Sequence, residues 1–134
     1  MGGETCDTSV LVPAVLRWHE FHTPARAALS EIVAVPAHVI VEAYSVLTRL
    51  PAPHRLSARS ASELLGALPF PIVGLAPERH QSLVAELASR GVKGGAVYDG
   101  VVAATAAEHG LRLVSLDRRA SSTYDAVGVQ VRRL

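Results

Sequence analysis

The chain has 134 residues, with 13 Lys and Arg against 12 Asp and Glu, so its formal net charge is +1. This length predicts one domain, residues 1–134, that buries roughly 70% of the surface its unfolded chain exposes. Hydrophobic residues make up 49% of the sequence but aromatic residues only 4%, which predicts an Ala-, Val- and Leu-rich core and excludes intrinsic disorder. The near-zero charge excludes a generally basic surface, so any nucleic-acid contact has to be local.

The sequence is typical of a soluble cytoplasmic protein. Its single cysteine, Cys6, cannot form an intramolecular disulfide, which fits a reducing compartment. No apolar run approaches the roughly 18 residues of a membrane span, and the first residues lack the pattern of a signal peptide. We therefore expect a cytoplasmic protein that does not enter the membrane. No Cys–His arrangement is identifiable, so we interpret Cys6 as a small buried strand residue.

Short apolar runs alternate with helical patterns along the chain. We expect strands at residues 5–7, 32–35, 70–75, 111–116 and 127–131. We expect helices at residues 10–18, 23–30, 36–50, 57–68, 76–91 and 96–109, and a short helix or turn at 118–124. Strands that alternate with helices imply right-handed crossovers and a parallel sheet covered on both faces. The sequence therefore predicts a three-layer α/β/α sandwich with a central, mostly parallel sheet.

Four acidic residues lie in otherwise apolar surroundings. Asp7 and Asp117 each follow a predicted strand, and because ligands bind at the carboxyl ends of parallel strands, both are expected to face one crevice. Glu42 and Asp99 lie inside apolar helices, with no Lys or Arg within one helical turn. A buried carboxylate costs several kcal/mol unless it is paired or bound to a metal. Convergence of the four acids on a hard cation accounts for all of them.

Each acid also has an ordinary structural interpretation. Asp7 and Asp117 can be helix N-caps, and Glu42 and Asp99 can pair with an Arg from elsewhere in the fold. The placement of the set favours a metal site, because ligands that offer only oxygen select Mg²⁺ or Mn²⁺ over Zn²⁺. Such an ion lowers the pKa of a bound water and stabilises charge on a phosphoryl group. The remaining Asp, Asp125, is interpreted as a surface residue.

Four short segments carry these acids in order: CDTSVLV at 6–12, VEAYSVL at 41–47, YDGVVA at 98–103 and LVSLD at 113–117. In order and spacing, over essentially the whole chain, they resemble the four acidic motifs of PIN-domain ribonucleases. More narrowly, the chain resembles the VapC toxins of bacterial VapBC toxin–antitoxin systems. Each motif alone is loose, but all four in order within one α/β domain of this length are specific.

The resemblance implies an endoribonuclease toxin of a type II toxin–antitoxin system, which hydrolyses RNA phosphodiesters with metal-activated water. It implies that one or two Mg²⁺ ions, with Mn²⁺ as a substitute, are held by the four acids Asp7, Glu42, Asp99 and Asp117. Ser9 and Ser115 match small polar residues that support these acids. The resemblance also implies a homodimer and a cognate VapB-type antitoxin that covers the acidic site. The alternative is a catalytically silent PIN-like scaffold that binds RNA or a partner protein. The presence of all four acids argues against this alternative.

An acidic pocket repels RNA, so cations that bind phosphate are expected around it. Arg118 and Arg119 directly follow Asp117, and Arg17 lies one helix beyond Asp7. We take these three as candidates for RNA binding, because the planar guanidinium binds two phosphate oxygens at once. For each of them an ordinary surface charge is the alternative. Arg132 and Arg133 are expected to serve solubility alone.

Several other residues have weaker functional interpretations. His19 and His22 are three residues apart, but with no third His or Cys nearby they are expected to be surface residues rather than a metal pair. Trp18 and Tyr44 are expected to pack in the core or an interface rather than to stack on bases. The sequence contains no Walker A motif, no G-x-G-x-x-G fingerprint and no G-x-S-x-G elbow, so the corresponding enzyme classes are excluded.

Overall fold

The computed structural model describes residues 2–134, and strands and helices alternate along them. The strands are β1 (Glu4–Cys6), β2 (Val35–Pro36), β3 (Ile72–Val73), β4 (Arg112–Ser115) and β5 (Val131–Arg133). The helices are α1 (Thr8–Val15), α2 (His22–Leu29), α3 (Ala37–Thr48), α4 (Ala58–Gly66), α5 (Arg79–Ser89), α6 (Ala96–Glu108) and α7 (Ser121–Val127). A single 3₁₀ turn, η1 (Arg118–Ala120), joins β4 to α7. No helix among these residues is long and apolar enough to cross a membrane.

The strand pairs within the described residues are parallel. Strand β4 lies between β1 and β5, and β2 pairs with β3. The two parts meet where Glu4 bridges Ile32 and where the Val33 amide donates to the Glu4 carbonyl at 2.9 Å. The strands therefore follow the order β3-β2-β1-β4-β5, and β1 and β4 end side by side at the centre of the sheet. Their neighbouring carboxyl ends are where Asp7 and Asp117 emerge.

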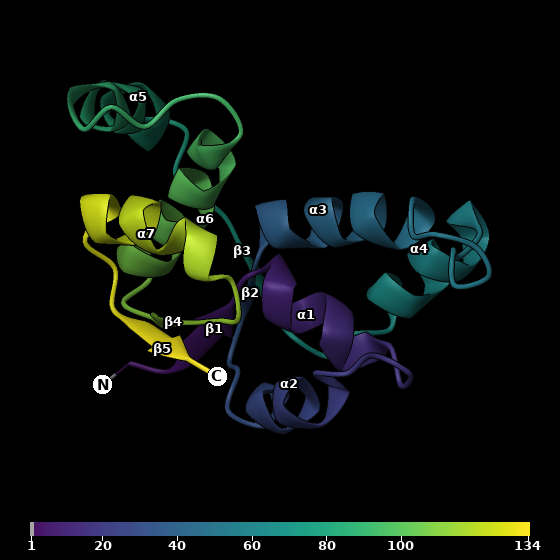
Figure 1. Ribbon diagram of the computed structural model, residues 1–134. Coiled ribbons are helices and arrows are strands. Elements are labelled where there is room, and N and C mark those ends of the chain that lie inside the picture. The colour runs from purple at the N-terminus through teal and green to yellow at the C-terminus, as the bar shows by residue number, and fades with distance from the viewer. Residues whose placement is uncertain (1) are drawn as a thin grey trace.

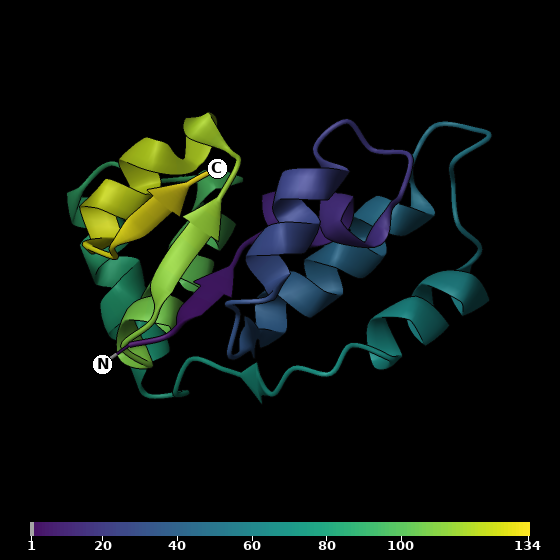
Figure 2. The same cartoon turned by 90° about the horizontal axis from the view of Figure 1, so that it is seen from below.

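The predicted three-layer α/β/α fold with a parallel sheet is confirmed. Figure 1 shows α6 and α7 above β4 and β5, α1 continuing from the end of β1, and α2 and α3 beside α1 on the far side of β1 from β4. Helix α5 packs on α6 and α7, and α4 packs on α3. Figure 2 shows β1, β4 and β5 side by side and pointing the same way. The loops that leave their carboxyl ends therefore share one edge of the molecule.

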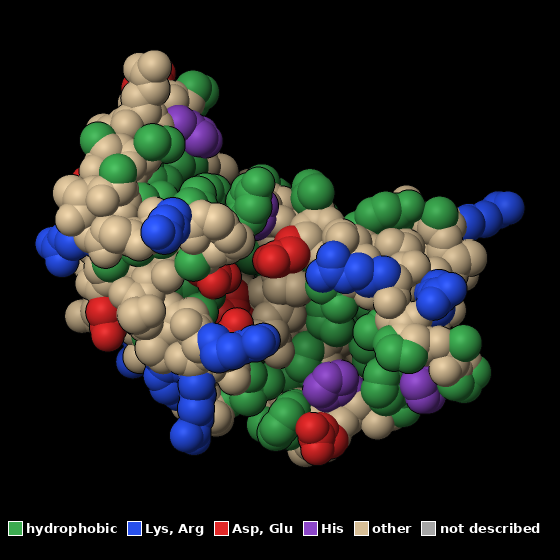
Figure 3. All heavy atoms as spheres, turned by 45° about the horizontal axis from the view of Figure 1, so that its top comes forward, with side chains coloured by type: hydrophobic (Ala, Val, Ile, Leu, Met, Phe, Trp, Pro, Cys, Tyr) green, Lys and Arg blue, Asp and Glu red, His purple; other side chains and the backbone are tan. Residues whose placement is uncertain are grey.

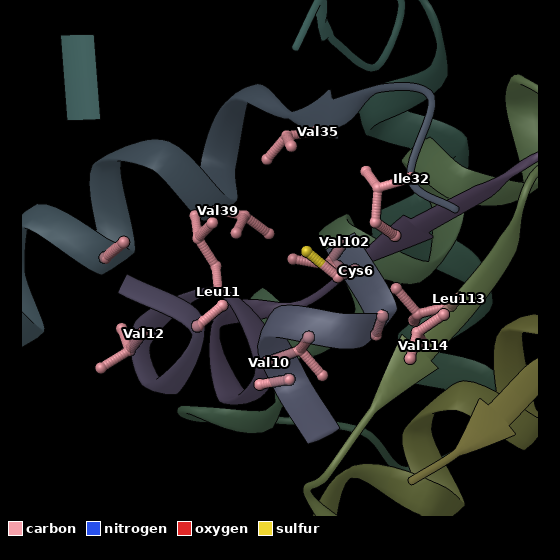
Figure 4. Close-up of a cluster of buried hydrophobic side chains, with 14 of the residues drawn as sticks. Cys6, Val10, Leu11, Val12, Ile32, Val35, Val39, Val102, Leu113 and Val114 are labelled. Atoms are coloured by element: carbon pink, nitrogen blue, oxygen red, sulfur yellow. The ribbon is translucent and has the colours of Figure 1, made fainter. Parts of the chain in front are cut away.

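The core consists of small aliphatic side chains, as the composition predicts. Figure 4 shows this cluster, in which Cys6, Val10, Leu11, Val39 and Leu113 are fully buried between the sheet and the neighbouring helices. Each such aliphatic side chain contributes about 1.5–3 kcal/mol when fully buried. The free thiol of Cys6 is buried among them, and burial raises its pKa, which agrees with its interpretation as a packing residue.

The end of the chain differs from the prediction. The strand predicted at 127–131 is wrong, because α7 continues to Val127 and β5 occupies Val131–Arg133. The helix ends at Gly128, whose φ of 89° lies in the left-handed region that glycine adopts without a steric penalty. The strand predicted at 32–35 is also shorter, because Val33 is 51% exposed and only Val35 and Pro36 join the ladder to β3.

The first two helices have other limits than those predicted. Helix α1 ends at Val15 and α2 begins at His22, so residues 16–21 form a loop and Thr23 is inside α2 rather than its N-cap. This loop exposes 50% of Trp18 and 44% of Phe21. Of the two places predicted for Trp18, the core is therefore wrong, and packing in an interface stays a prediction.

Arg132 has a structural role that the sequence analysis did not predict. Its Nε and Nη2 donate to the two carboxylate oxygens of Glu4 at 2.8 and 2.7 Å. Arg112 donates from Nε to the same carboxylate at 2.7 Å. Because these residues lie on β5, β1 and β4, the ion pairs connect three neighbouring strands. The prediction that Arg132 serves solubility alone is wrong.

Candidate active site

Asp7 is the most deeply buried of the four candidate acids, with 5% of its surface exposed. It stands at the N-cap position of α1, but its side chain accepts no capping hydrogen bond. Its Oδ1 accepts from the Ser9 hydroxyl instead. Its Oδ2 accepts from Ser115 Oγ at 2.5 Å and from the Tyr124 hydroxyl at 2.6 Å. The carboxylate is therefore held in place by residues from three parts of the chain.

The protonation of Asp7 depends on two opposing effects. Burial raises its pKa, because removal from water disfavours the charged form, while the hydrogen bonds from Ser115, Ser9 and Tyr124 lower it. Burial dominates, and the net shift is upward. The pKa of Tyr124 is also raised, first by burial and then by the charge of Asp7. The phenol therefore keeps its proton and remains a hydrogen-bond donor.

The hydroxyls of Ser9 and Ser115 also fix the start of the loop after β4. Ser9 Oγ accepts from the Leu116 amide at 2.8 Å, and Ser115 Oγ accepts from the Asp117 amide at 3.0 Å. The Asp117 Oδ1 in turn accepts from the Arg119 amide at 2.9 Å and caps η1. The capping interpretation of Asp117 is therefore correct, and its backbone is tied to the Asp7 carboxylate through one serine.

Glu42 lies on α3, half-buried, and its Oε1 accepts from the Thr8 hydroxyl. Among residues 2–134 it forms no ion pair, so the alternative of an Arg partner is wrong. Neither Thr8 nor Tyr124 was among the candidate site residues predicted from the sequence. The position of Thr8 beside Asp7, at the carboxyl end of a strand, is a signal that could have identified it. For Tyr124 the sequence contains no such signal, because its 117-residue separation from Asp7 is closed only by the fold.

The pKa of Asp99 gives the most direct evidence that the four acids lie close together. It lies in the first turn of α6 and is half-buried. Its pKa is raised to about 6, first by burial and then by the negative charges of Asp117, Glu42 and Asp7. Arg119 opposes this shift only weakly, as the smallest of its causes. Figure 3 shows Asp and Glu side chains gathered in a hollow of the surface.

The carboxylates of the four acids are the kind of ligands that a hard divalent cation prefers. A carboxylate offers about four lone-pair sites, so Asp7 has one left after its three hydrogen bonds. Asp99 accepts no hydrogen bond from the protein within the described residues, and no ion pair there neutralises it. As the side chains lie, no three His, Cys, Asp or Glu residues in 2–134 form a group that could hold a metal ion. Binding an ion would therefore require the side chains to turn toward one another.

The three candidate RNA-binding arginines differ in how close they lie to the acids. The Arg119 side chain is 96% exposed, and its Nε lies 3.7 Å from Asp117 Oδ1. Arg118 is exposed beside it, and Arg17 is exposed in the loop after α1. His19 and His22 do not form a metal pair: Nδ1 of His19 accepts from the Phe21 amide, and Nδ1 of His22 contacts the Pro13 carbonyl.

This combination of a parallel α/β/α fold, two acids that follow neighbouring strands and two acids on helices matches a known family. The family model described as PIN domain matches residues 5–126, so the chain belongs to the PIN domain family. It is 41% identical over 126 residues to Ribonuclease VapC40 of Mycobacterium tuberculosis, covering 93% of this chain and 94% of that protein. It is 40% identical to Ribonuclease VapC27 of the same organism, covering 93% of this chain and 92% of that protein.

Solved structures show the same fold at low sequence identity. VapC20 of Mycobacterium tuberculosis, described as a sarcin-ricin loop cleaving toxin, aligns with a TM-score of 0.70 and 16% identity, over 93% of this chain and 95% of that one. A chain of the DNA-bound VapBC complex of Salmonella typhimurium aligns with a TM-score of 0.68 and 19% identity, over 99% of this chain and 98% of that one.

Proposed function

We propose that this protein is an endoribonuclease toxin of a type II toxin–antitoxin system, which acts on RNA in the cytoplasm. The observation that carries the proposal is the collection of Asp7, Glu42, Asp99 and Asp117 around one hollow, where burial and then the charges of the other three acids raise the pKa of Asp99 to about 6. Such uncompensated charge is characteristic of a site that binds a cation during its reaction. The names of the relatives, Ribonuclease VapC40 and Ribonuclease VapC27, support RNA as the substrate.

The four acids would hold one or two Mg²⁺ ions, with Mn²⁺ as a substitute. When bound, the metal supplies a water of lowered pKa and neutralises charge on the phosphoryl group. The protein's own contribution is to hold Asp7 and Glu42 by hydrogen bonds, and the side chains would turn toward one another to bind the ion. Ser9, Ser115 and Tyr124 fix both oxygens of Asp7, and Thr8 fixes one oxygen of Glu42. Groups that orient metal ligands in this way typically change metal affinity 10- to 100-fold.

The RNA backbone would be held by Arg119, with Arg118 and Arg17 as further contacts. Arg119 is the best placed of the three, because its exposed guanidinium reaches the edge of the acidic hollow. Its charge offsets part of the repulsion between RNA and the carboxylates. The fork of the guanidinium can bind two oxygens of one phosphate.

We further propose that the protein forms a homodimer and binds a VapB-type antitoxin. Structural relatives were solved as VapBC and FitAB complexes, each described with DNA. This chain also exposes apolar side chains suited to protein contacts: Val41 and Tyr44 on α3 are 68% and 38% exposed, and Ile72 on β3 is 51% exposed. Sedimentation of the isolated chain and of the chain co-expressed with its antitoxin tests both associations.

The function is tested by incubating total RNA with the purified protein and Mn²⁺, then mapping the cut ends. We expect discrete cleavage by the wild type and none by Asp7→Asn or Asp99→Asn. Asp125→Asn is the matched control, because Asp125 is exposed on α7 and takes no part in the site. Circular dichroism of each variant checks that the fold is retained. Equal cleavage by all four proteins contradicts the proposal, and RNA binding without cleavage, insensitive to chelator, favours a silent scaffold.

A further inference from the structure

A pocket of about 410 Å³ opens beside the acids and shares residues with them. Thr8, Ser9 and Asp117 line it on the side of the acidic hollow. The remaining floor is apolar and consists of Val12, Pro13, Val46 and Leu116. Its volume lies in the range of about 300–1,000 Å³ that is usual for small-molecule sites. The acid chemistry described above explains neither the apolar floor nor its opening toward solvent.

Two rings from the loop between α1 and α2 complete the wall. His19 and Phe21 line the pocket, with their ring centroids 5.9 Å apart, and Phe21 keeps 44% of its surface exposed. The Phe21 amide donates to Nδ1 of His19 at 3.1 Å, so the proton of the neutral ring is on Nε2, which is left as a donor. Figure 3 shows hydrophobic and His side chains on the surface below the acidic hollow.

The rings continue away from the pocket as a row. Trp18 lies 5.6 Å from His19 and stacks on His54 at 4.0 Å with 22° between their planes. Trp18 is 50% exposed. Successive exposed rings beside a cationic groove are how proteins bind unpaired bases, because every base has a face that stacks. The row therefore suits a single strand that leaves the acidic hollow along the loop.

The pocket also contains a cation. Arg119 lines it next to Asp117, and its guanidinium is almost fully exposed. A nucleotide presents a flat base and an anionic phosphate joined by one sugar, so the two chemistries in this pocket match its two ends. An apolar peptide side chain of the antitoxin would match the apolar floor but would bring no phosphate to Arg119.

We propose that this pocket is a subsite for one unpaired nucleotide of the substrate RNA, whose base stacks on Phe21 and His19 while Arg119 binds its phosphate. The subsite lies next to Asp117, so the nucleotide it holds flanks the scissile phosphate. This proposal rests on the ribonuclease function and goes further by assigning a site that selects single-stranded RNA through its bases. Phe21 and His19 act by positioning the substrate and take no part in the chemical step.

Binding without cleavage tests the subsite independently of activity. The probe is a short fluorescent single-stranded RNA of mixed sequence, and anisotropy is measured in EDTA so that no metal-dependent cleavage occurs. We expect Phe21→Leu to weaken binding roughly ten-fold, since it removes one stacking partner, and Phe21→Trp to restore it. We expect Arg119→Gln to reduce the slope of log affinity against log salt by about 0.7, the value for one phosphate contact with a single strand. Arg90→Gln, at the exposed residue that follows α5, is the matched control and should leave the slope unchanged.

The outcomes separate this proposal from the ribonuclease function. Unchanged RNA affinity in Phe21→Leu overturns the subsite, whether or not the wild type cleaves RNA. Unchanged RNA affinity together with weaker capture of the co-expressed antitoxin identifies the pocket as a protein-binding site and also overturns it. If the wild type binds but does not cleave, and Phe21→Leu weakens binding, the subsite stands and the ribonuclease function fails. Where cleavage occurs, Phe21→Leu should raise KM and leave kcat within about two-fold of the wild type.

Discussion

The Tyr124 hydroxyl donates to Oδ2 of Asp7 at 2.6 Å, across 117 residues of sequence. Tyr124 is the largest fully buried side chain in the part of the chain that the structure describes, and its only polar atom is directed at the most buried candidate ligand. Helix α7 is thereby connected to the carboxyl end of β1. The Tyr124 side chain therefore packs in the core and donates a hydrogen bond to the site.

Tyr124→Phe is expected to destabilise the protein while keeping its packing. The variant removes a hydrogen bond to a charged group, which contributes about 1.5–3 kcal/mol. It also raises the pKa of Asp7 further, because this hydrogen bond favours the ionised form. Urea unfolding measures the loss. Tyr44→Phe is the control, since the Tyr44 side chain is partly exposed on α3, and equal stability of the two variants contradicts the expectation.

Thr8→Val is expected to weaken metal binding with little effect on stability. The Thr8 hydroxyl orients Glu42, and loss of such a contact typically costs a metal site at least about ten-fold in affinity. The concentration of Mg²⁺ that gives half-maximal RNA cleavage should therefore rise roughly ten-fold. Thr8→Ser keeps the hydroxyl and should behave as the wild type. An equal defect in Thr8→Ser would contradict the expectation, because that variant keeps the hydroxyl.

Without metal, the protein is expected to lose stability as the pH rises from about 4 to about 7. Asp99 has a pKa of about 6 in the folded chain against the usual 3.8, so between these values the folded state holds a proton that the unfolded state has released. Stability therefore falls with rising pH. The loss is about 1–2 kcal/mol after allowance for partial solvent screening. Burial of Asp7 acts in the same direction.

Urea unfolding in EDTA at about pH 5 and about pH 7 measures this dependence. Asp99→Asn should reduce it and should stabilise the metal-free protein at the higher pH. Saturating Mg²⁺ should stabilise the wild type by about 2.7 kcal/mol at a hundred times its Kd, and Asp99→Asn by less. A wild type whose stability is insensitive to both pH and Mg²⁺ would contradict the proposed cation site.

Glu4→Gln is expected to destabilise the sheet by about 1–3 kcal/mol without a direct effect on RNA cleavage. Glu4 is buried and accepts from both Arg112 and Arg132, but these two guanidinium groups are partly exposed, so solvent screens part of the interaction. Arg132 is the main cause of the lowered pKa of Glu4. The stabilisation is therefore present above the usual Glu pKa and is lost as the pH falls through the lowered value.

The pH dependence of Glu4 has the opposite sign to that of Asp99, so the two can be separated by urea unfolding between about pH 3 and about pH 7. Glu63→Gln is the matched control, because Glu63 pairs with Arg59 on an exposed face of α4. Such a surface pair contributes about 0–1 kcal/mol. Equal losses in the two variants would show that burial gives the Glu4 network no advantage.

Patterns local in the sequence predicted the fold class and the candidate acids. Alternating strands and helices gave the parallel sheet, because the hydrophobic periods of the two elements are properties of short segments. Asp99 and Glu42 could be recognised as candidate site residues because each interrupts an apolar helix and has no basic residue one turn away. The limits of α1 and α2 and the last strand were predicted less well, since tertiary packing and the left-handed Gly128 decided them.

The residues that hold the site together were not predictable in the same way. Thr8, Tyr124 and the bond between Arg132 and Glu4 act between segments that are distant in sequence. Phe21 and Trp18 are ordinary apolar residues in the sequence, and only the loop after Val15 turns them outward. A local sequence pattern does not predict which side chains will be in contact across a sheet.

The sequence by itself determined that this chain forms a parallel α/β sandwich and that four acids stand apart from the rest of its twelve acidic residues. The tertiary structure decided how those acids are held, which of their neighbours donate hydrogen bonds to them, and that rings and a cation lie beside them. The physical reason is the distance along the chain over which each interaction acts. Hydrophobic periodicity and turn chemistry act over a few residues, whereas burial and charge depend on every segment that packs around a group.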